Sequence, residues 1–168
     1  MGTSSQPGTV SFGPGIDRLL GVFKVDFEAD PVQPGWGRLV LATVVSLVGS
    51  LGADALVVAA GTRVFTSTKG YVHFQFSDYA KLTVIGVIIA CVAWPVVTRI
   101  SSQPRWLFFR MAIVVTLVLF VPDLWIFLHG APGKAVSVLL VMHLAIALVT
   151  YNALVHIAPV GARRSGRR

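Results

Sequence analysis

Three ionisable side chains interrupt the long apolar stretches of this 168-residue chain: Asp54, Asp123 and His143. An ionisable group inside a bilayer costs at least about 2.5–3.5 kcal/mol on insertion scales, so such a group is either satisfied by a buried partner or used in function. Two carboxyl groups beside an imidazole can bind and exchange a proton. These residues are therefore the candidates for chemistry in this chain.

The three residues lie at matched depths. At a rise of about 1.5 Å per residue, each is about 9–12 Å from the same end of its apolar stretch. Ser46 and Ser50 precede Asp54 at helical spacing and extend one polar stripe along a helix. We expect Asp54, Asp123, His143 and Ser50 to form one intramembrane polar cluster near the outer face.

Two interpretations of this cluster remain open. In the structural one, hydroxyl groups and His143 satisfy the carboxyl groups of Asp54 and Asp123, and the cluster holds the helices together. In the functional one, the cluster is a protonatable site of a small proton-coupled transporter or channel that exchanges with the outside. The sequence offers no evident polar path onward to the cytoplasmic side.

The motifs of enzymes and cofactor sites are missing. His143 and His156 are thirteen residues apart on one stretch, but the other three stretches offer no histidine to complete a bis-histidine haem site. The sequence has no closely spaced histidine, cysteine or aspartate residues of the kind that bind a metal. It also has no phosphate-binding loop and no nucleophilic serine with flanking glycines. We expect a protein that is not an enzyme and has no cofactor, metal or catalytic residue.

Four apolar stretches must position the cluster. They run over about 39–62, 82–97, 106–128 and 135–158, and a spanning helix needs about 20 predominantly apolar residues. The fold class predicted is an all-α, integral membrane four-helix bundle. We place a disordered tail at 1–15, an amphipathic segment and linker at 16–35, the transmembrane domain at 36–158 and a basic tail at 159–168.

The sequence also predicts where the second stretch ends and how the stretches are connected. The second should end at Trp94–Pro95, because proline disrupts a helix interior. The connection 63–81 alternates Val72, Phe74 and Phe76, which predicts a short strand or an aromatic flap at the interface. Short connections favour antiparallel packing between consecutive helices.

The basic residues predict the orientation. Of the 14 lysines and arginines, ten flank one side of the bundle and four the other. The positive-inside rule then puts both termini in the cytoplasm. The smaller group comprises Arg63, Lys69, Lys81 and Lys134. We interpret the basic tail as a topology anchor on anionic lipid, not as a nucleic-acid site, and the first stretch as a retained signal-anchor.

A short amphipathic helix precedes the bundle. Ile16, Leu19, Leu20 and Phe23 recur at i, i+3, i+4 and i+7, which indicates one apolar face lying on the membrane surface or on a partner. These four residues are the predicted partner-docking surface.

Several short motifs carry a resemblance to a known family. They are Gly-Ala-Asp-Ala-Leu-Val-Val-Ala-Ala-Gly at 52–61, Val-Pro-Asp-Leu at 121–124 and Leu-Val-Met-His-Leu-Ala at 140–145. The chain resembles the DUF6069-type family of small four-span actinobacterial membrane proteins, with the similarity expected over about 38–156. The resemblance supplies a fold but no activity.

Together these features favour an accessory or scaffold subunit of a larger complex in the cell inner (plasma) membrane. Its expected partners are other integral membrane subunits and membrane lipids. An actinobacterial cell-envelope lipid transport system is the host that the resemblance suggests. The competing interpretation is the small proton-coupled transporter or channel that uses Asp54, Asp123 and His143.

Overall fold

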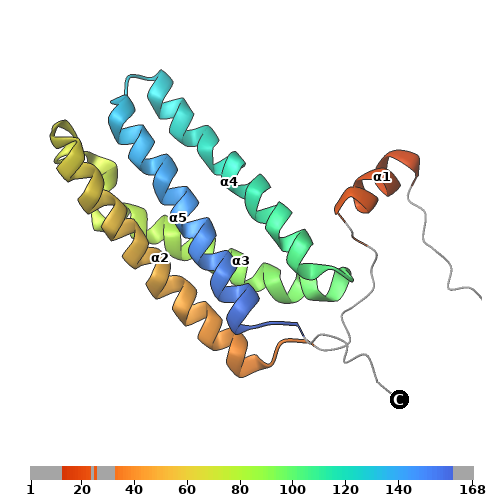
Figure 1. Cartoon of the computed structure of the whole chain (residues 1–168). Helices are drawn as coiled ribbons and strands as arrows, with labels where there is room; N and C mark the ends of the chain where they lie inside the picture. Colours follow the sequence, from red (N-terminus) through yellow and green to blue (C-terminus); the bar gives the residue numbers. More distant parts are fainter. Residues whose placement is uncertain (1–12, 24, 26–32, 161–168) are drawn as a thin grey trace, which may run out of the picture.

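The computed structural model describes residues 13–23, 25 and 33–160. This part of the chain holds five α-helices, two short 3₁₀ turns and no strand (Figure 1). The helices are α1 (Pro14–Phe23), α2 (Trp36–Val64), α3 (Phe76–Ile100), α4 (Pro104–Leu128) and α5 (Gly133–Ile157). The predicted all-α class is confirmed. The tails predicted at 1–15 and 159–168 lie largely outside the described residues, and their boundaries stay predictions.

The four long helices can each cross a membrane. α2 has 29 residues, and α3, α4 and α5 have 25 each. At about 1.5 Å per residue the shorter ones reach about 37 Å, more than the roughly 30 Å hydrocarbon core of a bilayer. Their outward faces carry valine, leucine and isoleucine. The chain is a multi-pass membrane protein.

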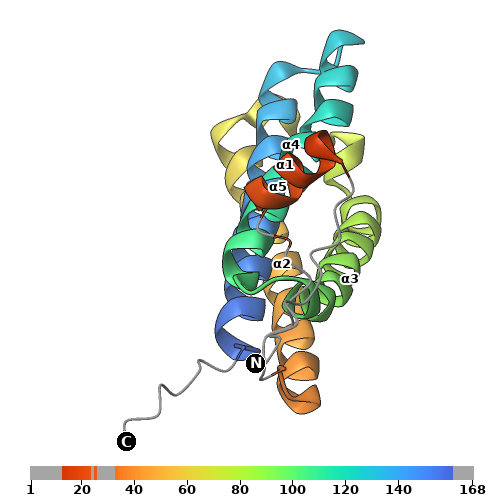
Figure 2. The same ribbon diagram turned by 90° about the vertical axis from the view of Figure 1, so that its right-hand side faces the viewer.

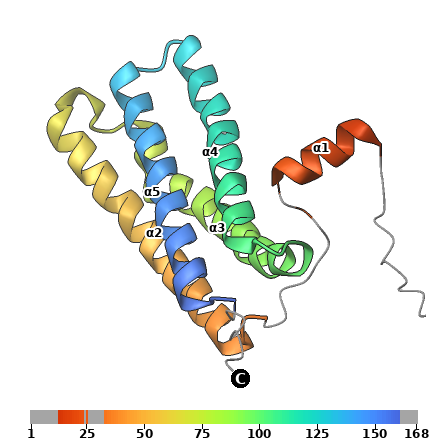
Figure 3. The ribbon, with the colours of Figure 1, turned by 45° about the vertical axis from the view of Figure 1, so that its right-hand side comes forward.

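Helix α5 is the centre of the bundle. It packs along α2 on one side and α4 on the other, and α3 lies against α2 (Figures 1 and 3). α2 and α5 share the most extensive contact, although they are the first and last spans. The α2–α3 and α4–α5 connections lie together at the loop end. α2 begins and α5 ends at the opposite end, called here the termini end (Figure 1).

Two glycines of α2 permit this close approach to α5. A Cβ atom on Gly61 would lie 2.6 Å from Cγ2 of Val138, and one on Gly49 would lie 2.9 Å from Cγ1 of Val149. Real Cβ atoms do not come so near a neighbour. The absence of a side chain at these positions is therefore what brings the two helices together.

The expected end of the second span at Pro95 is wrong. α3 continues through Pro95 to Ile100. Fully buried Trp94 donates from Nε1 to the carbonyl oxygen of Ala158 at 2.9 Å, and Thr98 Oγ1 donates to the carbonyl oxygen of Pro95 at 2.9 Å. Packing of Trp94 against the end of α5 therefore stabilises the helix around Pro95, although proline has no amide hydrogen to donate.

Of the two structures expected for the α2–α3 connection, a short strand or an aromatic flap, the strand is wrong. Thr66–Thr68 and Val72–Phe74 form 3₁₀ turns, and α3 already begins at Phe76. Within this segment the backbone hydrogen bonds join residues three positions apart. The backbone nitrogen of Phe74, for example, donates to the carbonyl oxygen of Tyr71 at 2.9 Å. The described chain has no second strand to pair with this segment, so local bonds satisfy its backbone.

Two apolar clusters fill the bundle at different levels. The core at the termini end is built around Trp94, Phe108 and Leu154. The loop-end cluster consists of Val138, Leu139 and Met142 of α5, against which aromatic rings of the α2–α3 connection and the start of α3 pack. These rings belong to Phe65, Tyr71, Phe74 and Tyr79. They act as a cover over one end of the bundle interior.

The close α2–α5 contact yields a stability prediction. Gly61→Ala should lower the free energy of unfolding by about 1–3 kcal/mol, the usual cost of overpacking. Gly52→Ala is the matched control, because nothing lies within 4 Å of a Cβ placed there, and it should be neutral or slightly stabilising. Thermal unfolding in detergent measures both. Equal effects of the two substitutions would refute the role assigned to Gly61.

A second prediction concerns orientation. If the basic residues set the topology, single cysteines at Tyr71 and Lys134 should react with an impermeant maleimide in intact cells, while a cysteine after Arg168 should react only after lysis. Reaction of the C-terminal cysteine in intact cells would show that the termini end faces outward.

Candidate functional site

The buried ionisable residues form a polar layer between the two apolar clusters. We use this name for Asp54 of α2, Thr83 of α3, Asp123 of α4 and His143 of α5. Each of the four spans contributes one member. Asp54 is completely buried, and Asp123 and Thr83 are buried as well. Polar groups at this depth have no bulk water, so their partners must come from the protein or from bound solvent.

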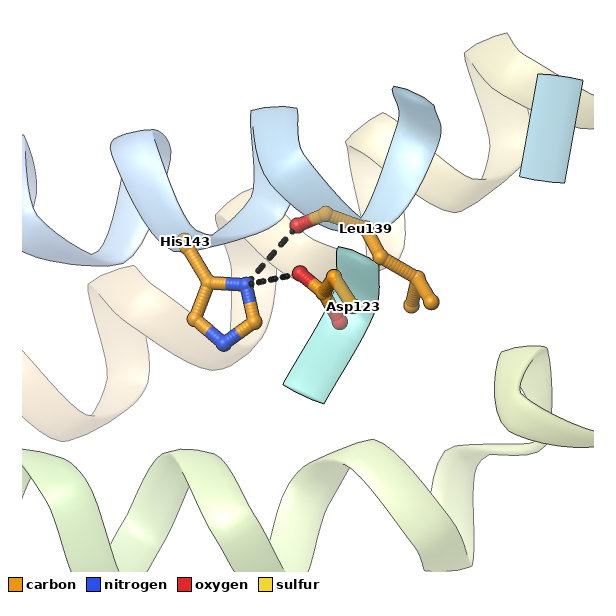
Figure 4. A network of polar contacts seen from close by, with 3 residues as sticks. All are labelled: Asp123, Leu139 and His143. Atoms are coloured by element: carbon orange, nitrogen blue, oxygen red, sulfur yellow. Dashed lines mark hydrogen bonds and ion pairs between the residues drawn. The ribbon is translucent and has the colours of Figure 1, made fainter. Parts of the chain in front are cut away.

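Asp123 and His143 contact each other directly. Nδ1 of His143 lies 3.1 Å from Oδ2 of Asp123 and 3.0 Å from the carbonyl oxygen of Leu139 (Figure 4). Both neighbours are hydrogen-bond acceptors, so Nδ1 carries a proton. Figure 4 shows Nε2 on the edge of the ring that faces away from α5. The pair thus fixes the tautomer of His143 and leaves Nε2 available.

Asp54 has a different partner. Its Oδ2 accepts a hydrogen bond of 2.6 Å from Oγ1 of Thr83. Its Oδ1 is buried and has no hydrogen-bond partner in the described part of the chain. Asp54 is close enough to His143 to interact electrostatically, but no hydrogen bond between the described groups joins them. Oδ2 of Asp123 also has no hydrogen bond but lies in ion-pair contact with His143, so Oδ1 of Asp54 is the carboxylate oxygen of the layer that has neither kind of partner among the described groups.

The predicted cluster is thus assembled in two parts. Asp123 and His143 are in contact, while Asp54 bonds instead to Thr83, a residue that sequence reasoning did not identify. The available signal was that Thr83 is the one hydroxyl residue within the apolar stretch 82–97. Ser50 lies one turn from Asp54, and its hydroxyl is 3.2 Å from that of Thr150. Ser50 belongs to the α2–α5 contact.

Two tyrosines face the layer from the loop end. Tyr71, in the connection, interacts electrostatically with Asp123, and Tyr79 of α3 interacts with Asp54. Burial, followed by the Asp123 carboxylate, raises the pKa of the Tyr71 hydroxyl. This hydroxyl therefore remains neutral over the physiological range. The aromatic cover thus holds hydroxyls that can donate and accept protons within electrostatic range of both carboxyl groups.

The opposite side of the layer is mostly apolar, although the buried hydroxyl of Ser46 also lies there. Beyond Ser50 and Thr150, the interior is filled by the core around Trp94, Phe108 and Leu154. Trp94 and Phe108 meet edge to face, with ring centroids 5.1 Å apart. Cys91 is buried in the same core, beside the hydroxyls of Thr43 and Ser46. The polar layer is nearer to the loop end than to the termini end.

The described residues contain no cluster of three histidine, cysteine, aspartate or glutamate side chains that could hold a metal. His143 and Asp123 supply only two such groups in contact. His156 lies near the other end of α5, where it is exposed and its Nδ1 is 2.9 Å from the carbonyl oxygen of Asn152. It therefore does not contribute to the polar layer.

The amphipathic helix α1 is a second candidate site. It stands off from the bundle beside the termini end of α4 (Figures 1 and 2). Ile16 and Leu19 are 52% and 60% exposed, and Leu20 is partly buried. The side chain of Phe23 is outside the described residues. Arg110 donates from Nη1 to the carbonyl oxygen of Val22 at 2.5 Å.

Arg110 also stacks on a neighbouring ring. Its guanidinium carbon lies 3.4 Å from the centroid of the Trp106 ring. A cation held over an indole face is attracted by the ring quadrupole and has restricted freedom. Trp106 therefore orients a side chain that joins α4 to the end of α1.

Comparison with known proteins identifies relatives of this chain. The model of a family of unknown function, DUF6069, matches residues 30–159. The chain belongs to this family, as its motifs predicted. It is also 32% identical over 80 residues to an undecaprenyl-diphosphatase of Bifidobacterium animalis subsp. lactis (strain AD011). That alignment covers 48% of this chain and 25% of the relative, so the chain spans about a quarter of that protein. No solved structure matches.

The Asp54–Thr83 bond yields a prediction. Thr83→Val should lower the free energy of unfolding by about 1–3 kcal/mol, because it leaves the buried carboxyl group without its donor. Thr83→Ser should retain most of the stability. The matched control is Thr116→Val, since the buried Thr116 hydroxyl bonds only to the carbonyl oxygen of Ala112 in its own helix. Denaturation in detergent measures all three.

A double-mutant cycle measures how much the Asp54–Thr83 hydrogen bond contributes to stability. In the Asp54→Leu background, Thr83→Val should cost much less than in the wild type, because the carboxyl group is already gone. Additive effects would mean that the Asp54–Thr83 bond contributes no stability.

Proposed function

We propose that this DUF6069 member is a non-enzymatic accessory subunit of a larger membrane complex. The observation that carries the proposal is the helix α1. It is amphipathic, yet its apolar residues Ile16, Leu19 and Val22 remain 49–60% exposed. A ten-residue helix is marginal by itself and depends on burying its apolar face. The bundle leaves that face open, and we propose that a partner subunit at the termini end covers it.

The link between α1 and the bundle supports this role. Arg110, oriented by Trp106, bonds to a backbone carbonyl of α1 and not to its apolar face. The helix is thereby positioned while its apolar face stays available. A segment that served only to stabilise the bundle would instead pack its apolar side chains into it.

The contacts of the polar layer support a non-catalytic role. An imidazole oriented by a carboxylate is half of the arrangement used to activate a nucleophile. The buried hydroxyls nearest to this level are already engaged, Thr83 by Asp54 and Ser50 with Thr150. A nucleophile for His143 would have to come from elsewhere.

The proposed setting is a lipid-handling complex of the plasma membrane, such as a cell-envelope lipid transport system. Similarity to a protein named as an undecaprenyl-diphosphatase supports a lipid context. The partners would be other integral membrane subunits and membrane lipids. The exposed cations at the ends of the spans suit lipid headgroups, and no nucleic-acid role is proposed.

The second candidate is a small proton-coupled transporter or channel that uses Asp54, Asp123 and His143. The burial of both aspartates and their interactions with the partly buried His143 favour it. Transport requires access to the site from both sides of the membrane in turn. The core around Trp94, Phe108 and Leu154 separates the layer from the termini end, so transport would require that core to open. We therefore rank the accessory role first.

The decisive experiment is co-purification from native membranes. The tagged full chain, extracted in mild detergent, should carry the same integral membrane subunits at a fixed ratio. Ile16→Ala with Leu19→Ala should reduce their recovery about tenfold, which corresponds to roughly 1.4 kcal/mol of binding energy. The matched control is Ile85→Ala with Ile89→Ala, the same chemical change at exposed positions of α3, and it should have no effect.

Two outcomes would contradict this function. Recovery of the wild type as a monomer or homo-oligomer without other subunits would remove the accessory role and favour the transporter. Full recovery of partners with the α1 double variant would show that α1 binds only the lipid surface.

A further inference from the structure

Asp54 presents an unsatisfied buried oxygen. The residue is completely buried, Oδ2 accepts from Thr83, and Oδ1 has no hydrogen-bond partner among the described groups. Leaving such an atom unsatisfied costs at least about 1–3 kcal/mol, and more when the group is charged. Nearly all buried polar atoms in native proteins have a partner. The oxygen therefore points to a small ligand that completes its bonding.

The charges of the layer indicate which ligand this is. The layer has two carboxyl groups and one imidazole, and the other titratable groups that face it are Tyr71 and Tyr79. If His143 is cationic, it balances the carboxylate of Asp123 and leaves Asp54 in excess. One additional proton would make the layer neutral, as a membrane interior favours.

A metal ion is a poorer fit than a proton. The described residues contain no set of three acidic, histidine or cysteine ligands. Asp54 and His143 interact only at longer range, whereas His143 touches Asp123. A proton needs only a single basic atom, and the buried Oδ1 of Asp54 supplies it.

We propose that the polar layer is a proton-binding site, with Asp54 as the proton-binding carboxyl group and the loop-end compartment as the source of the proton. On binding, an acid in that compartment loses a proton and an O–H bond forms on Asp54. No other bond changes, and no oxidant or reductant is needed. The proton reaches the layer past the aromatic cover, where the neutral hydroxyls of Tyr71 and Tyr79 can relay it.

The apolar core makes exchange one-sided. Between the layer and the termini end lie Trp94, Phe108 and Leu154, which offer no titratable group. Cys91 is buried within that core, near Thr43 and Ser46. The site therefore responds to the pH of one compartment without conducting protons between two. This inference does not depend on the accessory role, since it concerns the bundle and not α1.

Protonation is measured directly in the full-length protein. Infrared difference spectra of the protein in liposomes, recorded across a pH step in light and heavy water, should contain a protonated-carboxyl band. Asp54→Asn should abolish it. Asp78→Asn, which removes a carboxyl group from the first turn of α3 outside the layer, should leave it unchanged. A band that persists in Asp54→Asn, or no titrating band in the wild type, would overturn the proposal.

Three further variants keep the test decisive if Asp54→Asn does not fold. Thr83→Val should shift the pH midpoint of the band, because it removes the hydrogen bond to Asp54, while Thr83→Ser should leave the midpoint nearly unchanged. Tyr79→Phe should slow the response without moving the midpoint. An identical midpoint in Thr83→Val and Thr83→Ser would overturn the assignment to Asp54.

Sidedness is tested in sealed liposomes of known protein orientation. A pH step on the loop-end side should change the band, and the same step on the termini side should not while the membrane remains tight. An equal response to both sides would overturn one-sided exchange and would favour the transporter over the accessory role. A missing band with intact partner recovery would overturn only this inference and leave the accessory role standing.

Discussion

The rest of the bundle depends on the close contact between α2 and α5. Because Gly49 and Gly61 have no side chains, Val149 and Val138 can approach the backbone of α2. Lipid tails are as apolar as valine, so association of these helices relies on close van der Waals contact and buried hydrogen bonds. The contact places Ser50 beside Thr150 and shields Asp54 completely from the lipid. Only then can α3 deliver Thr83 to its carboxyl group.

The interior is layered along the membrane normal. An aromatic cover and the loop-end cluster lie at one end, the polar layer is next, and a large apolar core occupies the termini end. This order places apolar side chains on both sides of the ionisable groups, toward each end of the bundle. It also explains why α3 must be long, since the segment beyond Pro95 carries Val97 and Thr98 into the core region.

The two candidate sites lie at opposite ends of the protein and suit different roles. The termini end presents α1 with an uncovered apolar face, held by Arg110, and suits docking to another membrane subunit. The loop end holds buried carboxyl groups under a cover of tyrosines and suits proton exchange. Both proposals are compatible in one molecule, since an accessory subunit can bind a partner on one side of a membrane and respond to the other. Membership of DUF6069 applies to the bundle, because the family match covers 30–159 and excludes α1.

The sequence by itself determined the four spans, the all-α class, the family and the shared depth of Asp54, Asp123 and His143, because apolar length and helical rise can be counted along a chain. Only the tertiary structure decided that Asp54 bonds to Thr83, that the first and last spans make the main contact, and that α3 continues past Pro95. The physical reason is that the rotation of each helix about its own axis is not set by its length or composition. Depth follows from residue number, but which face of a helix meets which neighbour depends on packing, and in a uniformly apolar span no periodic pattern records that face. The connection 65–75 differs for a related reason: its alternation indicates a strand, yet a strand needs a partner that only the assembled fold can provide.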